Sequence, residues 1–183
     1  MRRISLIFIL FMTACATWIP VEGPYESASH RFSIVLPEKW MKLKTDDYLL
    51  LSKDGPFLQY VLVQQRHTDK AFRHTRKKLR KGMLPQEAAQ VIIDEIASDR
   101  SVLSFQMIGN FPASVNGYDG FRLAFTHRNR DGVLFKTLYY GFLAEDWFYA
   151  IRYNAAQRYY FDKDIETFEK ILSSFELTQK KRG

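Results

Sequence analysis

Hydrophobic residues alternate with polar ones in several short segments of the chain, and this period of two predicts β-strands. Asp54-Gly55-Pro56 is a turn between two such segments, so these two strands are expected to form a hairpin. Short connections between the last three segments predict an antiparallel meander. The predicted strands lie at residues 32–36, 48–51, 57–64, 103–108, 118–126, 133–143 and 147–153.

Two other segments place hydrophobic residues at helical spacing. Residues 71–100 are helical in character, with Pro85 suited to a first turn, and a second helix is expected from about Asp162 to Phe175. The adjacent Tyr139 and Tyr140 must point to opposite sides of a strand, which leaves either helix cover on both sides or an exposed aromatic patch. We favour helix cover. The predicted fold is therefore α+β, with a mostly antiparallel sheet of about six to seven strands and helices packed on both faces.

The N-terminal segment has a different pattern. Basic residues at positions 2 and 3 precede an apolar run over residues 4–12, and small residues lead to Cys15, the one cysteine of the chain. The run has about half of the roughly 20 residues needed to span a bilayer. It resembles a bacterial lipoprotein signal, in which cleavage falls before Cys15 and this residue carries the lipid. The alternative is an ordinary signal peptide with a chance cysteine.

This interpretation divides the chain into four parts: a signal peptide (1–14), the lipidated Cys15 with a flexible tether (15–29), one globular domain (30–178) and a basic tail (179–183). An exported domain with a single cysteine cannot form an internal disulfide, which suits a thiol used for lipid attachment. The predicted location is the bacterial envelope, facing the periplasm. Ala16 after the cysteine weakly favours the outer membrane, because Asp at that position favours inner-membrane retention.

Composition adds information about partners. The chain has 183 residues, a formal net charge of +7 and 46% hydrophobic residues, enough for a sizeable core. A basic surface suits anionic lipid headgroups or acidic proteins, and export makes nucleic acid an unsuitable partner. Six basic residues fall within residues 73–81 and form a candidate site for an anionic surface or a partner, although such runs are usually just solvated. They are Arg73, Arg76, Lys77, Lys78, Arg80 and Lys81.

Motifs for catalysis and cofactors are missing from the sequence. The four histidines form no metal-type pair, no G-x-S-x-G motif is present, and the glycines do not follow a phosphate-loop order. The adjacent acidic pairs Asp46-Asp47 and Asp94-Glu95 are poorly placed for shared acid–base work. We therefore expect no enzyme activity, no metal and no cofactor.

The strand over residues 31–40, RFSIVLPEKW, resembles the opening of PsbP-like domains, whose fold is shared with a Ran-binding nuclear import factor family. Residues 117–121 (GYDGF) and 168–175 (FEKILSSF) are also similar. The resemblance implies an α/β/α sandwich and an accessory or assembly role rather than catalysis. The leading hypothesis is a membrane-anchored envelope lipoprotein that binds a protein partner. The alternatives are a lipid- or amphiphile-binding module and, less favoured, an unrecognised hydrolase.

Overall fold

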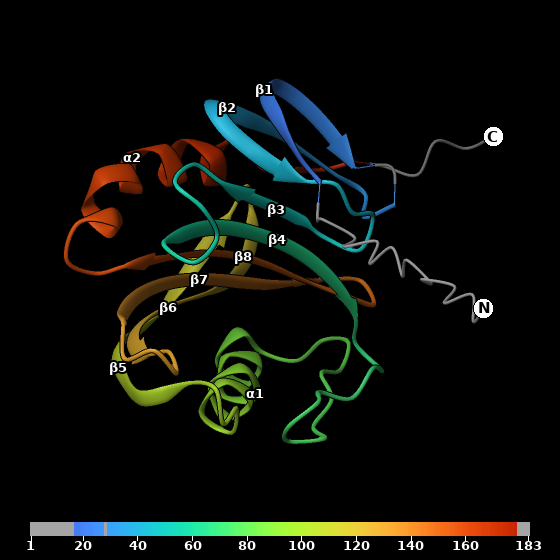
Figure 1. The fold of residues 1–183 in the computed structure, drawn as a ribbon. Helices are drawn as coiled ribbons and strands as arrows, with labels where there is room; N and C mark the ends of the chain where they lie inside the picture. Colours follow the sequence, from blue (N-terminus) through green and yellow to red (C-terminus); the bar gives the residue numbers. More distant parts are fainter. Residues whose placement is uncertain (1–16, 28, 179–183) are drawn as a thin grey trace, which may run out of the picture.

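The computed structural model describes residues 17–27 and 29–178. One antiparallel sheet of nine strands runs through the molecule in the order β1-β2-β3-β4-β8-β7-β6-β5, and the short β9 pairs with β2 (Figure 1). The strands are β1 (Trp18–Ser27), β2 (Phe32–Leu43), β3 (Leu49–Ser52), β4 (Gln59–His67), β5 (Leu103–Val115), β6 (Tyr118–Arg128), β7 (Leu134–Ala144), β8 (Trp147–Ala156) and β9 (Glu176–Leu177).

The helices are α1 (Pro85–Ala97) and α2 (Tyr160–Ser173). They lie against opposite faces of the sheet, as Figure 1 shows. Helix α1 packs on β5, β6 and β7, whereas α2 packs on β2, β4 and β8. Among the described residues, neither helix is long and apolar enough to cross a membrane.

The expected sandwich of six to seven strands between helices on both faces is wrong. The sheet has nine strands, and the only helices of the described residues are α1 and α2, with 13 and 14 residues. Each helix covers only part of its face, so no helical layer encloses the sheet. The prediction failed for three reasons. Residues 18–27, expected to belong to a tether, form β1, residues 176–177 form the unpredicted β9, and residues 71–84, expected to be helical, are irregular.

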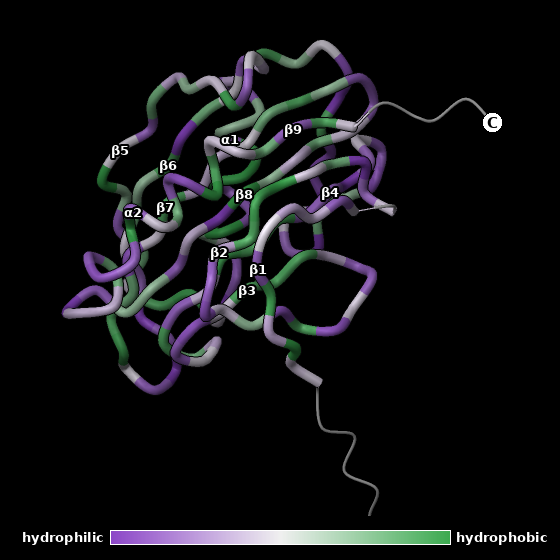
Figure 2. Tube along the Cα trace, turned by 90° about the horizontal axis from the view of Figure 1, so that it is seen from above, coloured by the Kyte–Doolittle hydropathy of each residue, from purple (hydrophilic) through white to green (hydrophobic). Residues whose placement is uncertain are grey.

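The alternation of side chains along the strands separates two hydrophobic cores. On β8, Tyr149, Ile151 and Tyr153 join the core beneath α2, whereas Phe148 and Ala150 join the core beneath α1. Figure 2 shows hydrophobic stretches along the strands and hydrophilic stretches in the loops at the periphery. The two cores are thus built from alternate positions of the same strands.

Several local predictions are confirmed. The hairpin around Asp54-Gly55-Pro56 joins β3 and β4, which pair antiparallel, and β6, β7 and β8 form the expected meander. The predicted signal peptide and Cys15 lie outside the described residues.

Candidate functional site

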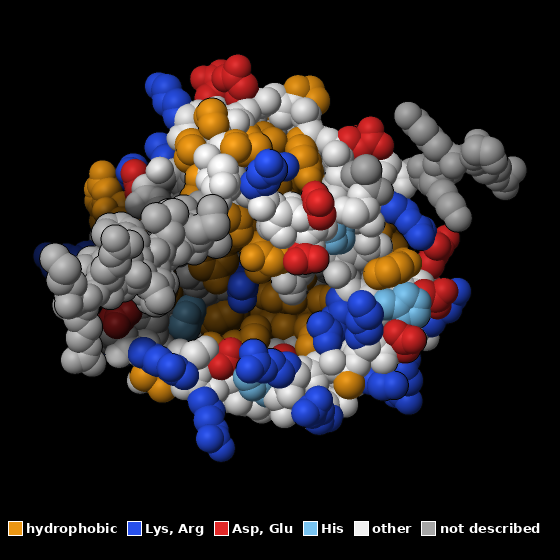
Figure 3. Space-filling view, turned by 45° about the vertical axis from the view of Figure 1, so that its right-hand side comes forward, with side chains coloured by type: hydrophobic (Ala, Val, Ile, Leu, Met, Phe, Trp, Pro, Cys, Tyr) orange, Lys and Arg blue, Asp and Glu red, His pale blue; other side chains and the backbone are white. Residues whose placement is uncertain are grey.

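A cleft of about 660 Å³ opens on the α1 face of the sheet, beside the part that α1 covers. Its floor crosses four neighbouring strands, β4, β8, β7 and β6. One wall is the C-terminal half of α1 with residues 72–74 of the preceding loop, and the ends are the turns at residues 56–57 and 129–131. In the space-filling view of Figure 3, hydrophobic side chains line a hollow at the centre of the surface, with Lys and Arg side chains below it.

The pairing register of the four strands aligns floor residues side by side, in rows that run across the sheet. Tyr60, Asn154, Thr137 and Phe125 are paired one to the next from β4 to β6. Thr137 Oγ1 donates a hydrogen bond to Asn154 Oδ1 at 2.7 Å, and both residues are buried. The floor is therefore a mixed surface, in which aromatic rings flank polar groups that are fixed by a hydrogen bond.

Arg152 of β8 brings a positive charge to this floor. Its Nε is buried and has no hydrogen-bond partner among the described residues. Its guanidinium carbon lies 5.2 Å from the ring centroid of Tyr60, within range of a cation–π interaction. Among the ion pairs of the described residues, none involves Arg152. The cleft therefore holds a charge that no carboxylate neutralises by direct contact.

His127 of β6 lies near this charge. Its ring stacks on Phe135 with a centroid distance of 5.6 Å, and its buried Nδ1 has no partner among the described residues. Burial lowers the pKa of His127, and the charge of Arg152 lowers it further. Imidazole is therefore neutral at physiological pH, with one nitrogen able to donate and the other able to accept.

Three acidic residues line the cleft: Glu95 and Asp99 on the wall, and the exposed Asp131 at the end of the cleft, where it accepts a hydrogen bond from Asn129 Nδ2. Glu95 of α1 accepts hydrogen bonds from the backbone N–H groups of His74 and Thr75 and from the Thr75 hydroxyl. Asp99 accepts from the backbone N–H and the hydroxyl of Ser101. These bonds contribute to lowering the pKa of both carboxyl groups against the opposing effect of burial. The carboxylates of Glu95 and Asp99 bond to groups of the wall, so neither forms an ion pair with Arg152 on the floor.

His74, Asp99 and Ser101 stand together but not in the order that acyl transfer requires. The Ser101 hydroxyl donates to Asp99 Oδ1 at 2.7 Å, and His74 Nε2 lies 3.6 Å from the other oxygen of Asp99. A serine nucleophile needs the imidazole next to the hydroxyl, with the carboxylate behind it. Here the carboxylate is in the middle. Within residues 17–27 and 29–178, no group of three or more His, Cys, Asp or Glu is placed to hold a metal ion.

The predicted basic run forms part of the loop between β4 and α1, and all six of its Lys and Arg side chains are exposed. The buried Phe72 and Leu79 hold the loop against the protein. Lys77 pairs with Asp94 of α1, and Lys81 Nζ lies 3.6 Å from Asp146. The run is therefore spread along a pinned loop, and its binding to an anionic surface or partner stays a prediction.

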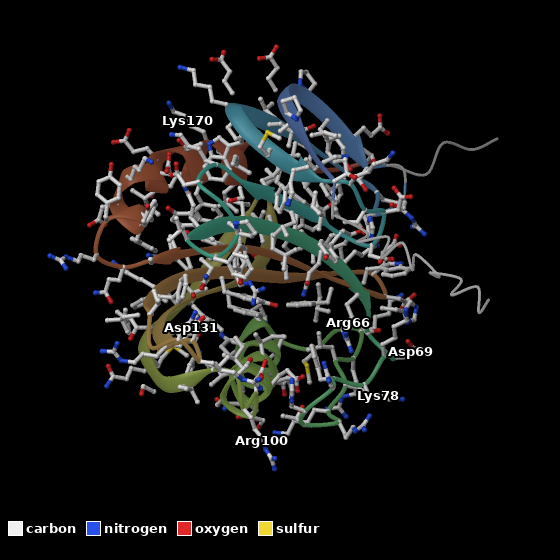
Figure 4. The ribbon with its side chains drawn as sticks, viewed as in Figure 1. Arg66, Asp69, Lys78, Arg100, Asp131 and Lys170 are labelled. Atoms are coloured by element: carbon white, nitrogen blue, oxygen red, sulfur yellow. The ribbon has the colours of Figure 1, made fainter. Side chains whose placement is uncertain are left out.

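Arg73 and Arg76 of this run meet two arginines that the sequence did not single out. Together with Arg100, after α1, and Arg130, in the β6–β7 turn, they border a depression of about 610 Å³ next to the cleft. Figure 4 shows Arg66 and Lys78 on one side of α1, Arg100 at its end and Asp131 at the β6–β7 turn. The basic surface is thus assembled from three separate parts of the chain.

The sequence pattern did not single out Arg152, Arg100 or His127. A polar residue at an inward position of a hydrophobic strand is a usable signal, and Arg152 and Asn154 show it on β8. Which face such a residue joins depends on the register with neighbouring strands, which the sequence pattern does not supply.

No family model matches the chain, and no curated protein matches it by sequence. Solved structures do match. Cyanobacterial PsbP (CyanoP) from Synechocystis sp. PCC 6803 is 11% identical with a TM-score of 0.61, and the match covers 91% of this chain and 95% of that one. A mutant of protein Mog1 is 11% identical with a TM-score of 0.55, covering 87% and 97%. LpqN of Mycobacterium tuberculosis, described as involved in cell envelope biogenesis, is 12% identical with a TM-score of 0.52, covering 90% and 92%. The fold is therefore of the PsbP/Mog1 kind.

Proposed function

We propose that the protein is a lipid-anchored, non-enzymatic accessory module of the bacterial envelope. In this proposal it binds a partner protein, an extended segment of which pairs with the free edge of β5 as an additional strand. The similarity to LpqN, a protein involved in cell envelope biogenesis, supports an envelope role. The carboxylate-centred arrangement of His74, Asp99 and Ser101 supports a binding role over hydrolysis. The observation that carries the proposal is the unprotected edge of β5.

Strand β5 ends the sheet and pairs only with β6 among the described strands. Its 13 residues include no charged side chain, although 26% of the chain is charged. Ile108 and Phe111 are 57% and 52% exposed. A long apolar edge offers backbone N–H and C=O groups to an incoming strand, together with side chains for it to contact.

The opposite edge of the sheet is built differently. Strand β1 carries Pro20 and Pro24, exposed Glu22 and Glu26, and a register shift between Val21 and Gly23. Prolines, charges and bulges are the devices that prevent an edge from accepting another strand. Strand β5 also has register shifts, between Leu103 and Gln106 and between Met107 and Gly109, but none of its side chains is charged. One edge of the sheet thus combines charge, proline and a register shift, whereas the first nine residues of β5, up to Pro112, have register shifts but neither charge nor proline.

Charges around β5 indicate what the partner looks like. Arg100 precedes the strand, Arg128 pairs with Leu103 across the ladder, and Arg130 follows in the next turn; all three are exposed. A second copy of the chain would bring the same positive groups, and the repulsion between them opposes its approach. The partner segment is therefore extended, apolar and uncharged in the middle, with acidic residues at the end that meets these arginines.

Site-specific crosslinking in intact cells tests the proposal. A photoreactive phenylalanine analogue in place of Ile108 should crosslink to one envelope protein, through a peptide with the chemistry just described. The same analogue in place of Glu22, on the protected edge, is the matched control. When Arg100→Glu and Arg128→Glu are introduced into the protein that carries the analogue at position 108, the crosslink should be lost, because the acidic end of the partner segment would meet negative charges. Equal crosslinking from both edges, a crosslinked dimer of this chain, or no adduct would each overturn strand addition.

The proposed anchor is tested separately. Cys15→Ser should move the protein from the membrane fraction to the soluble periplasmic fraction and abolish labelling with radioactive palmitate, because a lipidated cysteine is the proposed attachment. A variant with Ala16→Ser is the control and should stay in the membrane fraction. A Cys15→Ser protein that is still labelled and still sediments with membranes would contradict the anchor.

A further inference from the structure

We infer that the cleft on the α1 face binds a small organic anion, a carboxylate or phosphate monoester on an apolar body, with the anionic group against Arg152 and the body over the aromatic floor. This site is distinct from the β5 edge, and ligand binding in the cleft does not depend on whether a partner strand pairs with β5. Support for this site has three parts: the charge of the floor, the lining of the cleft, and the groups left without partners.

The charge of the floor is the first part. Arg152 contacts no carboxylate among the described residues, and the nearby carboxylates of Glu95 and Asp99 are held by the wall. An arginine that is half-buried without a counter-ion is unfavourable in the empty protein, and an anion would remove that cost. The planar guanidinium is also suited to bind a carboxylate or a phosphate through two parallel hydrogen bonds.

The lining is the second part. Tyr60, Phe125, Phe135 and Tyr139 present aromatic surface on the floor, while Ile92 and Ile96 of α1 present apolar surface on the wall. A volume of about 660 Å³ falls in the range of small-molecule sites. Such a lining favours a ligand with an apolar body over an inorganic ion, because a small ion would leave the aromatic surface wet.

The unsatisfied groups are the third part. Arg152 Nε and His127 Nδ1 are both buried without a hydrogen-bond partner, on the floor of one cleft. Arg122 Nε is also buried without a partner, but Arg122 alternates with Phe121 and Leu123 and therefore points to the other face, outside the cleft. An unpartnered arginine alone is therefore not the signal. The signal is an unpartnered arginine together with an unpartnered neutral imidazole in an aromatic cleft.

Three probes of equal shape and different charge test the site. They are 4-phenylbutyrate, 4-phenylbutanol and 4-phenylbutylammonium, titrated by calorimetry into the full chain carrying Cys15→Ser, which has no lipid. The anion should bind about tenfold or more tightly than the cation, since a charge-assisted hydrogen bond separates them. 4-Phenylbutyl phosphate, in a parallel titration, decides which anionic group is preferred. Equal binding of all three charge types, or no binding at millimolar concentration, would overturn the inference.

Two variants test whether Arg152 is the residue that binds the anionic group. Arg152→Met should weaken binding of the anion by about tenfold or more, and Arg122→Met, the matched control on the other face, should leave it unchanged. Amide shift changes in the Cys15→Ser protein should cluster at residues 125–127, 135–139 and 152–154, which does not depend on any cleft variant folding. Equal loss in both variants, or shift changes confined to the basic loop at 73–81, would place the anion elsewhere and contradict the inference.

Discussion

The two faces of the sheet are built from the same strands, yet one is sealed and the other is open. On the α2 face, Phe32, Phe168 and Phe175 have no exposed surface. On the α1 face, the floor of a cleft contains Arg152 and His127, whose buried nitrogens have no partner among the described residues. Both faces bury polar groups, so polarity alone does not distinguish them. Each face also has buried polar atoms without a partner among the described residues: Gln59 Oε1 and Arg122 Nε on the α2 face, Arg152 Nε and His127 Nδ1 on the α1 face. What differs is that the two on the α1 face lie together on the floor of one open cleft.

The α2 face shows how a buried charge is accommodated in this protein. Asp164 of α2 has 3% of its side chain exposed, and it accepts hydrogen bonds from Lys53 Nζ at 3.0 Å and from Gln59 Nε2 at 2.9 Å. The Tyr153 hydroxyl donates to the backbone carbonyl oxygens of Tyr160 and Phe161. These bonds tie the start of α2 to the β3–β4 hairpin and to β8. The buried carboxylate of Asp164 therefore has a cation and an amide as direct partners, whereas Arg152 has no carboxylate partner among the described residues.

Along the α1 face of β8, residue type changes where the cover of helix α1 ends. Its α1-face positions read Phe148, Ala150, Arg152 and Asn154, changing from apolar under the helix to polar in the cleft. Its α2-face positions stay apolar or aromatic along the strand. Where the cover of α1 ends, the sheet is left with a cleft whose floor is partly polar.

The largest expected difference between the faces concerns packing. Phe168→Ala should lower the free energy of unfolding by about 4 kcal/mol, because it empties a fully enclosed position in the α2-face core. Ile96→Ala, at the half-buried wall of the cleft, should cost only about 1 kcal/mol, since little enclosed cavity forms there. Urea unfolding monitored by circular dichroism measures both. Equal losses would show that the two faces are packed to the same extent.

The second expected difference concerns polar groups. Asp164→Ala should cost about 2 kcal/mol, because it removes the acceptor of Lys53 and Gln59. Arg152→Met should cost less than about 1 kcal/mol, because it replaces a half-buried cation that has no carboxylate partner among the described residues with an apolar chain of similar length. Asp164→Asn, which keeps one acceptor oxygen, should fall between these two. The comparison is broken if Arg152→Met destabilises the protein as much as Asp164→Ala.

The smallest expected difference depends on pH. The pKa of His127 is lowered from 6.5 in the folded protein, so below pH 6.5 the unfolded chain binds a proton that the folded chain does not. His127 therefore lowers stability as the pH falls through 6.5 toward its folded pKa. His127→Phe should reduce the stability lost between about pH 7.5 and 5.5, measured by urea unfolding. Arg152→Met should reduce it less, because the charge of Arg152 is the second cause after burial. An unchanged pH dependence in His127→Phe would contradict this assignment.

Much of the fold could be predicted from local patterns. The β3–β4 hairpin follows from Asp54-Gly55-Pro56, the β6–β7–β8 meander follows from alternation and short turns, and α2 follows from its apolar stripe. Errors arose where a local signal was weak or misleading. Strand β1 has two prolines and a glycine, which read as a linker, yet it pairs with β2 along nearly its full length. Pairing with a distant strand overrode its composition.

The candidate sites, like the fold, have some features that local sequence patterns predict and others that they do not. The lipoprotein-like N-terminal pattern, the positive charge, the basic run and the lack of a catalytic motif could all be inferred from the sequence, because they depend on composition or on residues close together in the chain. That Arg152, His127 and Tyr60 share one cleft, and that the uncharged β5 lies at an edge of the sheet, depends on the tertiary structure. The reason is physical: side-chain alternation assigns a residue to one of two faces, but strand order and register decide which neighbours it meets there and what covers them.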